Sequence, residues 1–448
     1  MNKTSQGILA GTTAILITGS LAACGSTTPS SQASGNVVHL VYWNMWSGHW
    51  SSVIQHMVND FNKTHPKIQV TMLSVPSTSG DAKLLTAIAA GNPPDVFTEW
   101  NPTIGSFAAS KGIMPLNQFM TGHYRNVKKW FYPIALKFST YHKQIWALPM
   151  SLNTFMLYYN KTLMKQAGLN PNTPPKTITQ WNAEQAKMWK FNSNGGLQQV
   201  GYYPLVPNGG DEFDPLSNPF HYNPVHGHQY NLLSSNALNE MKWIGTYAKY
   251  PYSKVMGFMS AYNAAAGGSE DSFDVGKEGF WVNGMWDMSQ IQAVNAGMKY
   301  GVAPLPAPSA GTYGGTWVNG NYNIIPKGAK HPHAAFQFIL WMAGYQNTNW
   351  AGKHDAFGNW VPPSPQVTDS SSYQKFLSAN PLRKKFVQIL SNPHNSVTRL
   401  TPVEQEYVTK INNAMSYVLD HKETPLQAVT HVQNIVNAQW KRDIARGE

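Results

Sequence analysis

Strand-like and helix-like segments alternate along the chain from residue 37, and this order constrains the fold more than any other feature. Residues 37–43 are β-rich, apolar residues recur at helical spacing over 53–61, and apolar and polar residues alternate over 68–72. Residues 82–90 then predict a second helix, and residues 95–97 predict a third strand. Such an order favours strands buried beneath helices. We therefore predict an α/β fold in which helices cover a largely parallel sheet.

The same alternation returns in the second half of the chain. Helices are predicted at 181–189, 237–250 and 334–342, a strand at 300–304, and mostly helix beyond Pro381. The chain has 448 residues, which is too many for one ordinary hydrophobic core. We therefore expect two domains.

Cys24 is the single cysteine, and it follows an apolar segment, residues 7–23, that carries no charge. This segment is shorter than the roughly 20 apolar residues of a transmembrane helix, and it fits the apolar part of a secretory signal. The sequence Leu21-Ala22-Ala23-Cys24-Gly25 resembles the lipobox of bacterial lipoproteins. The resemblance implies that residues 1–23 are a signal peptide removed before Cys24, whose sulfur carries a diacyl (palmitate-type) lipid. The alternative is an ordinary signal peptide followed by an incidental free cysteine.

Two further consequences follow from this N-terminal region. Residues 24–36 are small and polar, so they predict a flexible tether between the lipid and the folded part. Because no second cysteine exists, the fold has no disulfide and depends on packed core alone.

The balance of charges is basic and the charge content is low. Lys and Arg number 33 against 22 Asp and Glu, which gives a net charge of +11, and charged residues are only 12% of the chain. A typical soluble domain has about 25%. A basic chain suggests nucleic acid or an anionic surface as a partner, but the cations are scattered and the densest cluster is only 383–385. An exported protein does not meet nucleic acid, so we predict no nucleic-acid partner.

The scarcity of carboxylates suggests an acidophile as the source. Below about pH 4 carboxylates become protonated, and any stabilising pairs that they form in a folded protein are lost. A surface of Asn, Gln, Ser, Thr and Tyr avoids that loss. Adaptation to an acidic medium is therefore a hypothesis that the composition supports.

Four segments match, in order, the sequence pattern of one known family. They are GNPPDVF at 91–97 with GIMPL at 112–116, WALP at 146–149 with LYYNK at 157–161, FDVGKEGFWVNGMW at 273–286, and IPKGAKHPHAAFQFILWM at 325–342. On these motifs the chain resembles the extracellular solute-binding proteins of ABC importers, the family typified by maltose-binding proteins. The match extends over most of the chain after the tether.

The resemblance implies a two-lobe periplasmic-binding-protein-like fold of type II, with hinge crossings between the lobes and the ligand in the cleft between them. Lobe one is expected to comprise 37–149 plus 324–360, and lobe two 150–323 plus 361–448. Crossings are expected at 148–151 and 319–323.

The resemblance also implies a function. We expect a monomeric receptor, lipid-anchored at the extracellular face of the cell membrane, without a cofactor and without enzymatic activity. It would bind a carbohydrate, expected to be an oligosaccharide, and deliver it to the permease subunits of an ABC transporter.

The candidate binding residues combine aromatic side chains with amides and carboxylates. Sugars present apolar C–H faces and rings of hydroxyl groups, so their sites need flat aromatic faces with polar groups beside them. In open α/β sheets, ligands bind beyond the carboxyl ends of strands. The candidates are Trp43, Asn44 and Trp46 at the C-terminal end of the first strand, Glu99, Trp100 and Asn101 after the third, Trp286 and Asp287 at the end of the third motif, and Trp317 and Asn319 at a crossing.

Trp286 is the strongest of these candidates, because it lies at the family's ligand-stacking position. Two other assignments stay open. Trp43 alternates with core residues and could belong to the core, and Asp287 could have a surface role.

Two other classes of function are disfavoured. A glycoside hydrolase needs two carboxylates about 5 to 10 Å apart. The acidic clusters at 211–214 and 270–274 lie in polar, Gly- or Pro-rich surroundings that predict solvated loops, so we assign no catalytic residue. The histidines at 221, 226 and 228 lie in a loop without nearby acids, so we predict no metal site.

A ligand other than sugar is the remaining alternative. Relatives within this fold bind other polar solutes, such as glycerol phosphodiesters, and phosphate favours arginine or helix-terminal amides. The candidate loops hold Trp, Asn and acids, and Arg125 is the only arginine before Arg383. This composition favours a neutral sugar.

Overall fold

The computed structural model describes residues 37–99, 103–205, 216–217, 219–220, 222–265, 271–397 and 399–445. Cys24, the signal segment and the tether lie outside the described residues, as do Trp100 and Asn101. In the part of the chain that is described, no helix is long and apolar enough to cross a bilayer.

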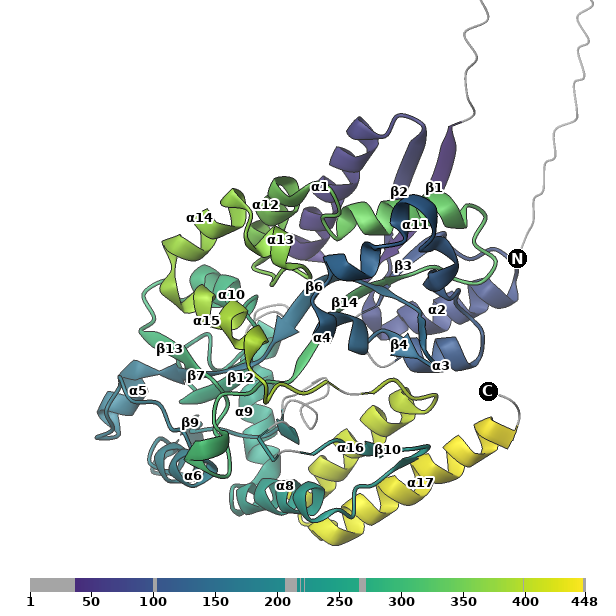
Figure 1. The fold of residues 1–448 in the computed structure, drawn as a ribbon. Helices are drawn as coiled ribbons and strands as arrows, with labels where there is room; N and C mark the ends of the chain where they lie inside the picture. Colours follow the sequence, from purple (N-terminus) through teal and green to yellow (C-terminus); the bar gives the residue numbers. More distant parts are fainter. Residues whose placement is uncertain are drawn as a thin grey trace, which may run out of the picture. The chain divides into compact units, whose positions relative to one another are not determined.

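The first lobe contains a five-stranded sheet in the order β2-β1-β3-β14-β6 (Figure 1). The strands are β1 (Val38–Asn44), β2 (Ile68–Ser74), β3 (Val96–Glu99), β6 (Leu148–Thr154) and β14 (Val318–Ile324). β1 pairs in parallel with β2 and β3, but β14 is antiparallel to both β3 and β6. Four of the five strands therefore run in the same direction, and the predicted largely parallel sheet is wrong only for β14. β6 leads out of this sheet toward the second lobe and β14 leads back, so the two run in opposite directions.

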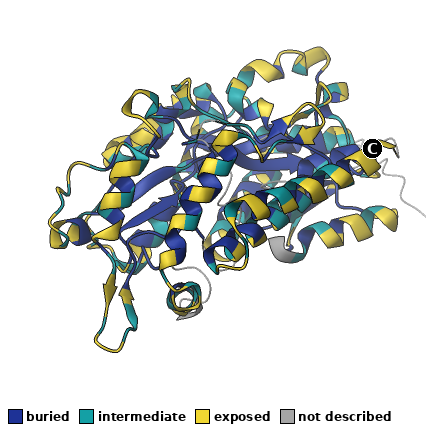
Figure 2. Cartoon of the chain, turned by 90° about the horizontal axis from the view of Figure 1, so that it is seen from below, coloured by how far each residue is buried: buried dark blue, intermediate teal, exposed yellow. Residues whose placement is uncertain are grey.

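Helices cover both faces of this sheet. On one face α1 (Gly48–Thr64) and α11 (Pro332–Met342) pack in one core with Tyr42 and Val96. On the other face α2 (Ser77–Ala89) and α3 (Thr103–Ala109) pack in a second core with Phe97 and Ile324. Strands β3, β6 and β14 are buried throughout, β1 and β2 are partly exposed, and the helices expose one side to solvent (Figure 2).

Helix α1 forms as its sequence pattern predicts. Its buried residues, Val53, Ile54, Met57, Val58 and Phe61, recur at helical spacing, so they form a single apolar stripe that faces the core. The helix ends at Thr64, and its C-cap residue, His65, directly precedes Pro66. A residue that precedes proline is disfavoured in the helical conformation, which explains the end point.

The second lobe is built around a three-stranded antiparallel sheet in the order β12-β7-β13. Its strands are β7 (Met156–Asn160), β12 (Phe280–Asn283) and β13 (Tyr300–Ala303). The helices that contribute to its core are α5 (Lys161–Gln166), α6 (Ile178–Ala186), α8 (Ser235–Gly245), α9 (Tyr252–Ala265), α10 (Asp287–Val294), α14 (Ser371–Ala379), α15 (Pro381–Gln388), α16 (Glu404–Leu419) and α17 (Pro425–Ala445). The predictions of helices near 181–189 and 237–250 and of a mostly helical C-terminal region are confirmed.

Short elements connect these layers. Three are two-stranded hairpins: β4 (Thr140–Tyr141) with β5 (Gln144–Ile145), β8 (Lys190–Phe191) with β9 (Leu197–Gln199), and β10 (Val225–His226) with β11 (Gln229–Tyr230). The remaining α-helices are α4 (Pro133–Lys137), α12 (Thr348–Gly358) and α13 (Pro365–Thr368). Short 3-10 helices lie at Leu116–Phe119, Gly122–Tyr124, Val127–Trp130, Thr246–Lys249, Ala310–Thr312 and Ile389–Ser391.

Within the described residues, the chain passes between the two lobes at three places. β6 continues into β7, and β14 returns to the sheet of the first lobe. The third passage lies between Trp360, which packs in the first-lobe core beneath α1 and α11, and Val361, which packs in the core of the second lobe. The Leu152 backbone N–H donates to the Val361 carbonyl at 2.7 Å, so two of the crossings are hydrogen-bonded to each other.

Candidate ligand-binding site

Buried amides line one face of the crossing strands. In β14, Asn319, Asn321 and Asn323 share a face because side chains alternate along a strand. Asn321 Nδ2 donates to Ser151 Oγ at 2.8 Å, and Thr98 Oγ1 donates to Asn323 Oδ1 at 2.8 Å. These two amides are thus each engaged within the protein through one atom, although Asn323 Nδ2 has no partner among the described residues.

Asn319 differs from the other two amides. It is 0% exposed, yet neither its Oδ1 nor its Nδ2 has a hydrogen-bond partner among the described residues. The residue paired with it in β6, Asn153, is 6% exposed, and its Oδ1 lacks a partner in the same way. A buried polar group without a partner costs about 1 to 3 kcal/mol. These atoms are therefore available to a bound polar molecule, which would remove that cost.

An aromatic group lies beside these amides in the chain. Phe155 follows β6, Trp317 precedes β14, and Trp286 precedes α10. The Phe155 ring lies 5.2 Å from the Trp317 ring and 5.7 Å from the Trp286 ring, with the latter pair edge to face. Trp317 is only 2% exposed, whereas Phe155 and Trp286 are half-buried. Three residues from separate segments thus form one aromatic cluster at the crossings.

Gly284 and Tyr158 position the Trp286 side chain. A Cβ on Gly284 would lie 1.8 Å from Trp286 Cζ3, so the indole occupies the space that any larger residue would fill. The Tyr158 hydroxyl donates to the Gly284 carbonyl at 2.6 Å, which fixes the turn between β12 and α10. The Trp286 orientation is therefore determined by its own loop.

The three candidates at the C-terminal end of β1 and just beyond it are mainly engaged in internal contacts. Asn44 is fully buried; its Nδ2 donates to the Trp46 carbonyl, Ser51 Oγ and Ser74 Oγ, and its Oδ1 accepts from the Trp46 backbone N–H. This amide thus holds the loop before α1. Trp46 is half-buried against Trp360, with ring centroids 5.6 Å apart. Trp43 is half-buried against the core around Phe97.

Glu99 is a buried carboxyl at the end of β3. It is hydrogen-bonded to Asp81, and burial raises the pKa of the Asp81 carboxyl while this hydrogen bond opposes the rise. Glu99 is thus paired within lobe one. Trp100 and Asn101, which follow it, lie outside the described residues.

Asp287 lies inside the second lobe rather than on its surface. It is fully buried, and its Oδ1 accepts from Asn283 Nδ2 at 2.9 Å. Burial, followed by the charges of Asp274 and Asp271, raises the pKa of Asp287 well above its usual range. The prediction of a solvated loop is wrong for the last two acids of the 270–274 cluster, because Asp274 is fully buried and Asp271 is half-buried.

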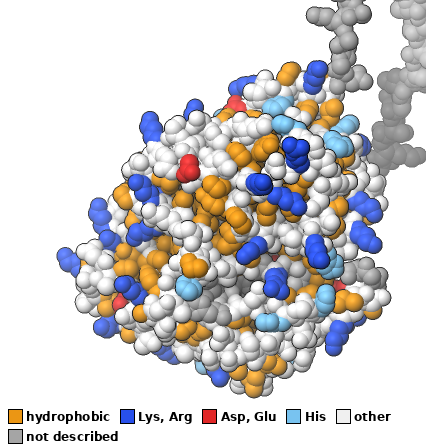
Figure 3. Space-filling view, viewed as in Figure 1, with side chains coloured by type: hydrophobic (Ala, Val, Ile, Leu, Met, Phe, Trp, Pro, Cys, Tyr) orange, Lys and Arg blue, Asp and Glu red, His pale blue; other side chains and the backbone are white. Residues whose placement is uncertain are grey.

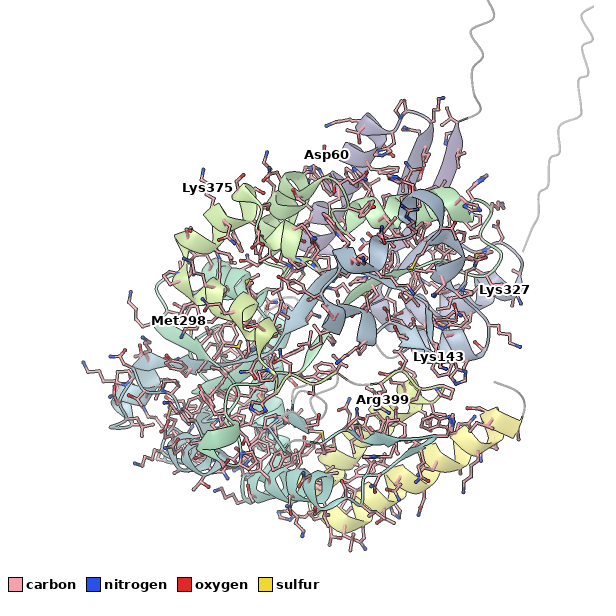
Figure 4. The ribbon with its side chains drawn as sticks, viewed as in Figure 1. Asp60, Lys143, Met298, Lys327, Lys375 and Arg399 are labelled. Carbon is pink, nitrogen blue, oxygen red and sulfur yellow. The ribbon has the colours of Figure 1, made fainter. Side chains whose placement is uncertain are left out.

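A groove between the lobes was missed by sequence reasoning. It has a volume of about 770 Å³ and is lined by α4, the β4–β5 and β10–β11 hairpins, residues 395–397 and 399–400, and Trp440. Lys137, His142, His228 and Arg399 are among its lining residues, and Lys, Arg and His side chains gather around this hollow in Figure 3. In Figure 4, Arg399 and Lys143 mark the segment before α16 and the β4–β5 turn. None of the predicted binding residues that the structure describes lines this groove.

The two-lobe fold and the ordered motifs agree with a direct family match. Residues 48–349 match the model of the bacterial extracellular solute-binding proteins. The chain belongs to this family. Family members are solute-binding receptors, and the extracellular setting of the family agrees with the secretory signal predicted for this solute-binding protein.

Individual relatives are similar to this solute-binding protein over different lengths. The maltotriose-binding protein of Pyrococcus abyssi (strain GE5 / Orsay) is 23% identical over 337 residues, which is 73% of this chain and 63% of the relative. The sn-glycerol-3-phosphate-binding periplasmic protein UgpB of Yersinia pestis bv. Antiqua (strain Antiqua) is 27% identical over 168 residues, which is 36% of this chain and 37% of the relative. The chain thus matches less than two thirds of the length of these curated relatives.

A solved structure matches over nearly all of this solute-binding protein. The structure of CpMnBP1 with mannotriose bound is 28% identical, with a TM-score of 0.78, and the match covers 89% of this chain and all (100%) of that chain. The two-lobe α/β fold expected from the motifs is confirmed.

Proposed function

We propose that this chain is the extracellular carbohydrate receptor of an ABC importer, and that it binds an oligosaccharide between its lobes and delivers it to the permease. The family match supports a receptor. The similar structure of CpMnBP1 holds mannotriose, and the relative from Pyrococcus abyssi is a maltotriose-binding protein. The observation that carries the proposal is the unpartnered, fully buried amide of Asn319, two residues from an aromatic cluster at the lobe crossings.

The proposed site contains both kinds of group that a sugar requires. The amides of Asn153 and Asn319 supply donors and acceptors for hydroxyl groups, and Phe155, Trp286 and Trp317 supply apolar faces. We propose that the other candidates make a secondary contribution to the sugar site. They are Trp43, Asn44, Trp46, Glu99, Trp100, Asn101 and Asp287. Asn44 and Asp287 would act by holding the loops that carry Trp46 and Trp286.

Calorimetric titration with mannotriose and maltotriose tests this site. We expect Trp286→Ala to lower the affinity for the sugar that binds by about 10- to 100-fold, because a lost aromatic contact removes about 1.5 to 3 kcal/mol. Asn319→Ala should weaken binding by about 10-fold. The matched control is Trp189→Ala, which removes another half-buried tryptophan that stacks on Tyr250 at 3.5 Å. Unchanged affinity in Trp286→Ala would refute the site assignment, and failure of every oligosaccharide in a thermal-shift panel would refute the ligand class.

An anionic solute is the second candidate, because one relative is a glycerol-3-phosphate-binding protein. The interlobe groove offers Lys137 and Arg399, which could pair with a phosphate. Glycerol 3-phosphate therefore belongs in the same thermal-shift panel. Stabilisation by glycerol 3-phosphate that Arg399→Ala abolishes would favour this candidate, whereas stabilisation by mannotriose that Arg399→Ala leaves unchanged would favour the sugar.

We further propose that the chain has no enzymatic activity, since the family and its solved relatives are receptors. Incubation of the purified chain with a labelled oligosaccharide should release no sugar. Release of a shorter product would instead support the glycoside hydrolase alternative.

The proposed anchoring and lobe division complete the functional assignment. Cys24 is proposed to carry the lipid that holds a monomeric receptor at the outer face of the membrane, with 24–36 as tether. The lobes are proposed to be 37–149 plus 324–360 and 150–323 plus 361–448, with the boundaries at 149–150 and 323–324 falling inside the crossing strands β6 and β14, whose side-by-side pairing belongs to the sheet of the first lobe. Cys24→Ala should move the protein from the membrane fraction to the medium, whereas an unchanged membrane fraction would exclude the lipid anchor.

A further inference from the structure

Three carboxylates meet inside the second lobe, although they come from two separate segments. Asp271 and Asp274 lie on a tight turn, and Asp287 is the first residue of α10. The turn is held by backbone hydrogen bonds from Gly276 to Phe273 at 2.8 Å and from Lys277 to Ser272 at 2.8 Å. Gly276 has φ of +76°, a conformation that favours glycine. The meeting of the three acids is therefore built into the fold.

The spacing of the three carboxylates suits one divalent cation. One oxygen atom of each residue lies within 4.8 Å of an oxygen atom of the other two. Calcium binds oxygen ligands at about 2.3 to 2.6 Å, so two ligands on opposite sides of one ion are about 5 Å apart at most. Three carboxylate oxygens around a common calcium ion must satisfy this limit, and these three do.

A second observation points to a ligand at the same place: one carboxylate oxygen of Asp287 has no hydrogen-bond partner among the described residues. Its Oδ1 accepts from Asn283 Nδ2, but its Oδ2 has no hydrogen-bond partner among the described residues, and the side chain is 0% exposed. Water cannot solvate this atom from the surface, and a bare buried carboxylate oxygen is strongly unfavourable. The atom therefore lacks a partner that a cation would supply.

The charges around these acids also favour a bound cation. Glu278 is a fourth buried carboxyl nearby, and the charges of Asp271 and Asp274 contribute to raising the pKa of its carboxyl, after burial itself. Among the ion pairs of the described residues, none includes Asp271, Glu278 or Asp287. Within the described part of the chain, Asp271, Glu278 and Asp287 thus form no ion pair with a lysine or an arginine.

We propose that Asp271, Asp274 and Asp287 bind one divalent cation, with calcium as the preferred ion. The cation ties the 271–276 turn to the start of α10 and neutralises the three acids. Since Asp287 directly follows Trp286, the ion also strengthens the loop that carries the proposed sugar-stacking residue. Asn283 acts as a positioning residue, because its amide holds the Asp287 carboxylate.

The test uses the full chain freed of metal with EDTA and then titrated with calcium or magnesium. We expect equilibrium dialysis to find one calcium ion per chain, and we expect calcium to raise the unfolding temperature by at least about 3 °C at saturation, more than magnesium does. Asp274→Asn and Asp287→Asn should lose both effects. Asp355→Asn is the matched control, since it removes a buried carboxyl outside the cluster and should keep the calcium response.

A second readout keeps the test decisive if a variant folds poorly. Terbium can replace calcium, and its luminescence is excited through a nearby tryptophan, here Trp286 or Trp281. Calcium should quench this signal by displacement, and the cluster variants should not show it. Absence of calcium binding to the metal-free wild-type chain, or calcium binding that persists in Asp274→Asn and Asp287→Asn, would overturn the proposal. Neither readout depends on sugar binding, so failure here leaves the proposed receptor function untouched.

Discussion

Asp355 shows at the scale of one residue how burial controls the response to pH. It is 3% exposed in α12, and burial raises the pKa of its carboxyl well above the usual range. A raised pKa means that the folded chain keeps this proton after the unfolded chain has lost it. The contribution to stability is therefore full below the unfolded pKa of about 4 and declines as pH rises through the folded pKa.

Asp355→Asn should make the protein more stable than wild type at pH 7 and leave its stability nearly unchanged at pH 3, because the amide does not ionise. Asp60 behaves in the opposite way. Burial raises the pKa of its carboxyl, but hydrogen bonds from Trp350 and His354 and nearby positive charges together outweigh burial, so the net shift of the pKa is downward. Asp60→Asn should therefore lose a small amount of stability at pH 7 and none at pH 3. Urea unfolding at both pH values measures these differences. Equal changes in stability at pH 3 and pH 7 for Asp355→Asn would contradict the argument.

The turn between β12 and α10 controls the site at the scale of one structural element. Asn283 Oδ1 accepts from the Gly284 backbone N–H at 2.8 Å, Tyr158 holds the Gly284 carbonyl, and the Trp286 indole lies over Gly284. The indole contact needs the absence of a side chain at position 284. The space left by the missing side chain of Gly284 thus gives the Trp286 indole a defined orientation.

Gly284→Ala should displace Trp286 and lower sugar affinity by about 10-fold or more, with a loss of about 1 to 3 kcal/mol in stability from overpacking. Gly257→Ala is the control, because a Cβ at this exposed position in α9 meets nothing within 4 Å. That substitution should leave affinity unchanged and raise stability by up to about 1 kcal/mol. Calorimetric titration and urea unfolding measure both quantities. Full affinity in Gly284→Ala would show that the orientation of Trp286 does not matter.

At the scale of the whole molecule, packing rather than ion pairing holds the fold together. The five ion pairs of the described residues lie at exposed or partly exposed positions, and two of them need a protonated histidine. Exposed pairs of this kind contribute about 0 to 1 kcal/mol each. Few acidic side chains are visible on the face that Figure 3 shows. Because Asp and Glu number only 22 in 448 residues, protonation of carboxylates should remove little stabilising interaction.

The metal-free chain should therefore unfold at nearly the same temperature at pH 3 as at pH 6. Raised pKa values of buried carboxyls such as Asp355 act in the same direction, since they favour the folded state at low pH. Calorimetry at both pH values with EDTA present is the measurement. A sharp drop in the unfolding midpoint between pH 6 and pH 3 would contradict adaptation to acid.

Most of the fold was predictable because its signals are local. The buried stripe of α1 and the position of Pro66 predict both the helix and its end. The direction of β14 was not predictable from local pattern, because an alternating strand reads the same whichever neighbour it pairs with. The burial of Asp271 and Asp274 was missed for a similar reason: polar, glycine-rich sequence is typical of solvated loops, and only packing against α10 encloses it.

The candidate site was predictable in part. Trp286 lies in a recognisable motif, and Trp317 and Asn319 lie at a predicted crossing. The structure places all three at the lobe crossings or beside them. Asn153 and Phe155 were missed, because nothing in Leu152-Asn153-Thr154-Phe155 distinguishes them from ordinary strand residues. The pairing of Asn153 with Asn319 across two strands is the signal that would have found them, and it exists only in the sheet.

The sequence by itself determined the class of fold, the family and the kinds of residue available for binding, because these depend on periodicity and on motifs that are contiguous along the chain. Only the tertiary structure decided which amides are left without partners and which acids come within reach of one another. The physical reason is that hydrogen-bond satisfaction and charge balance depend on neighbours distant in sequence. Asn44 and Asn319 look equivalent along the chain, but the first has every hydrogen bond filled and the second has none among the described residues.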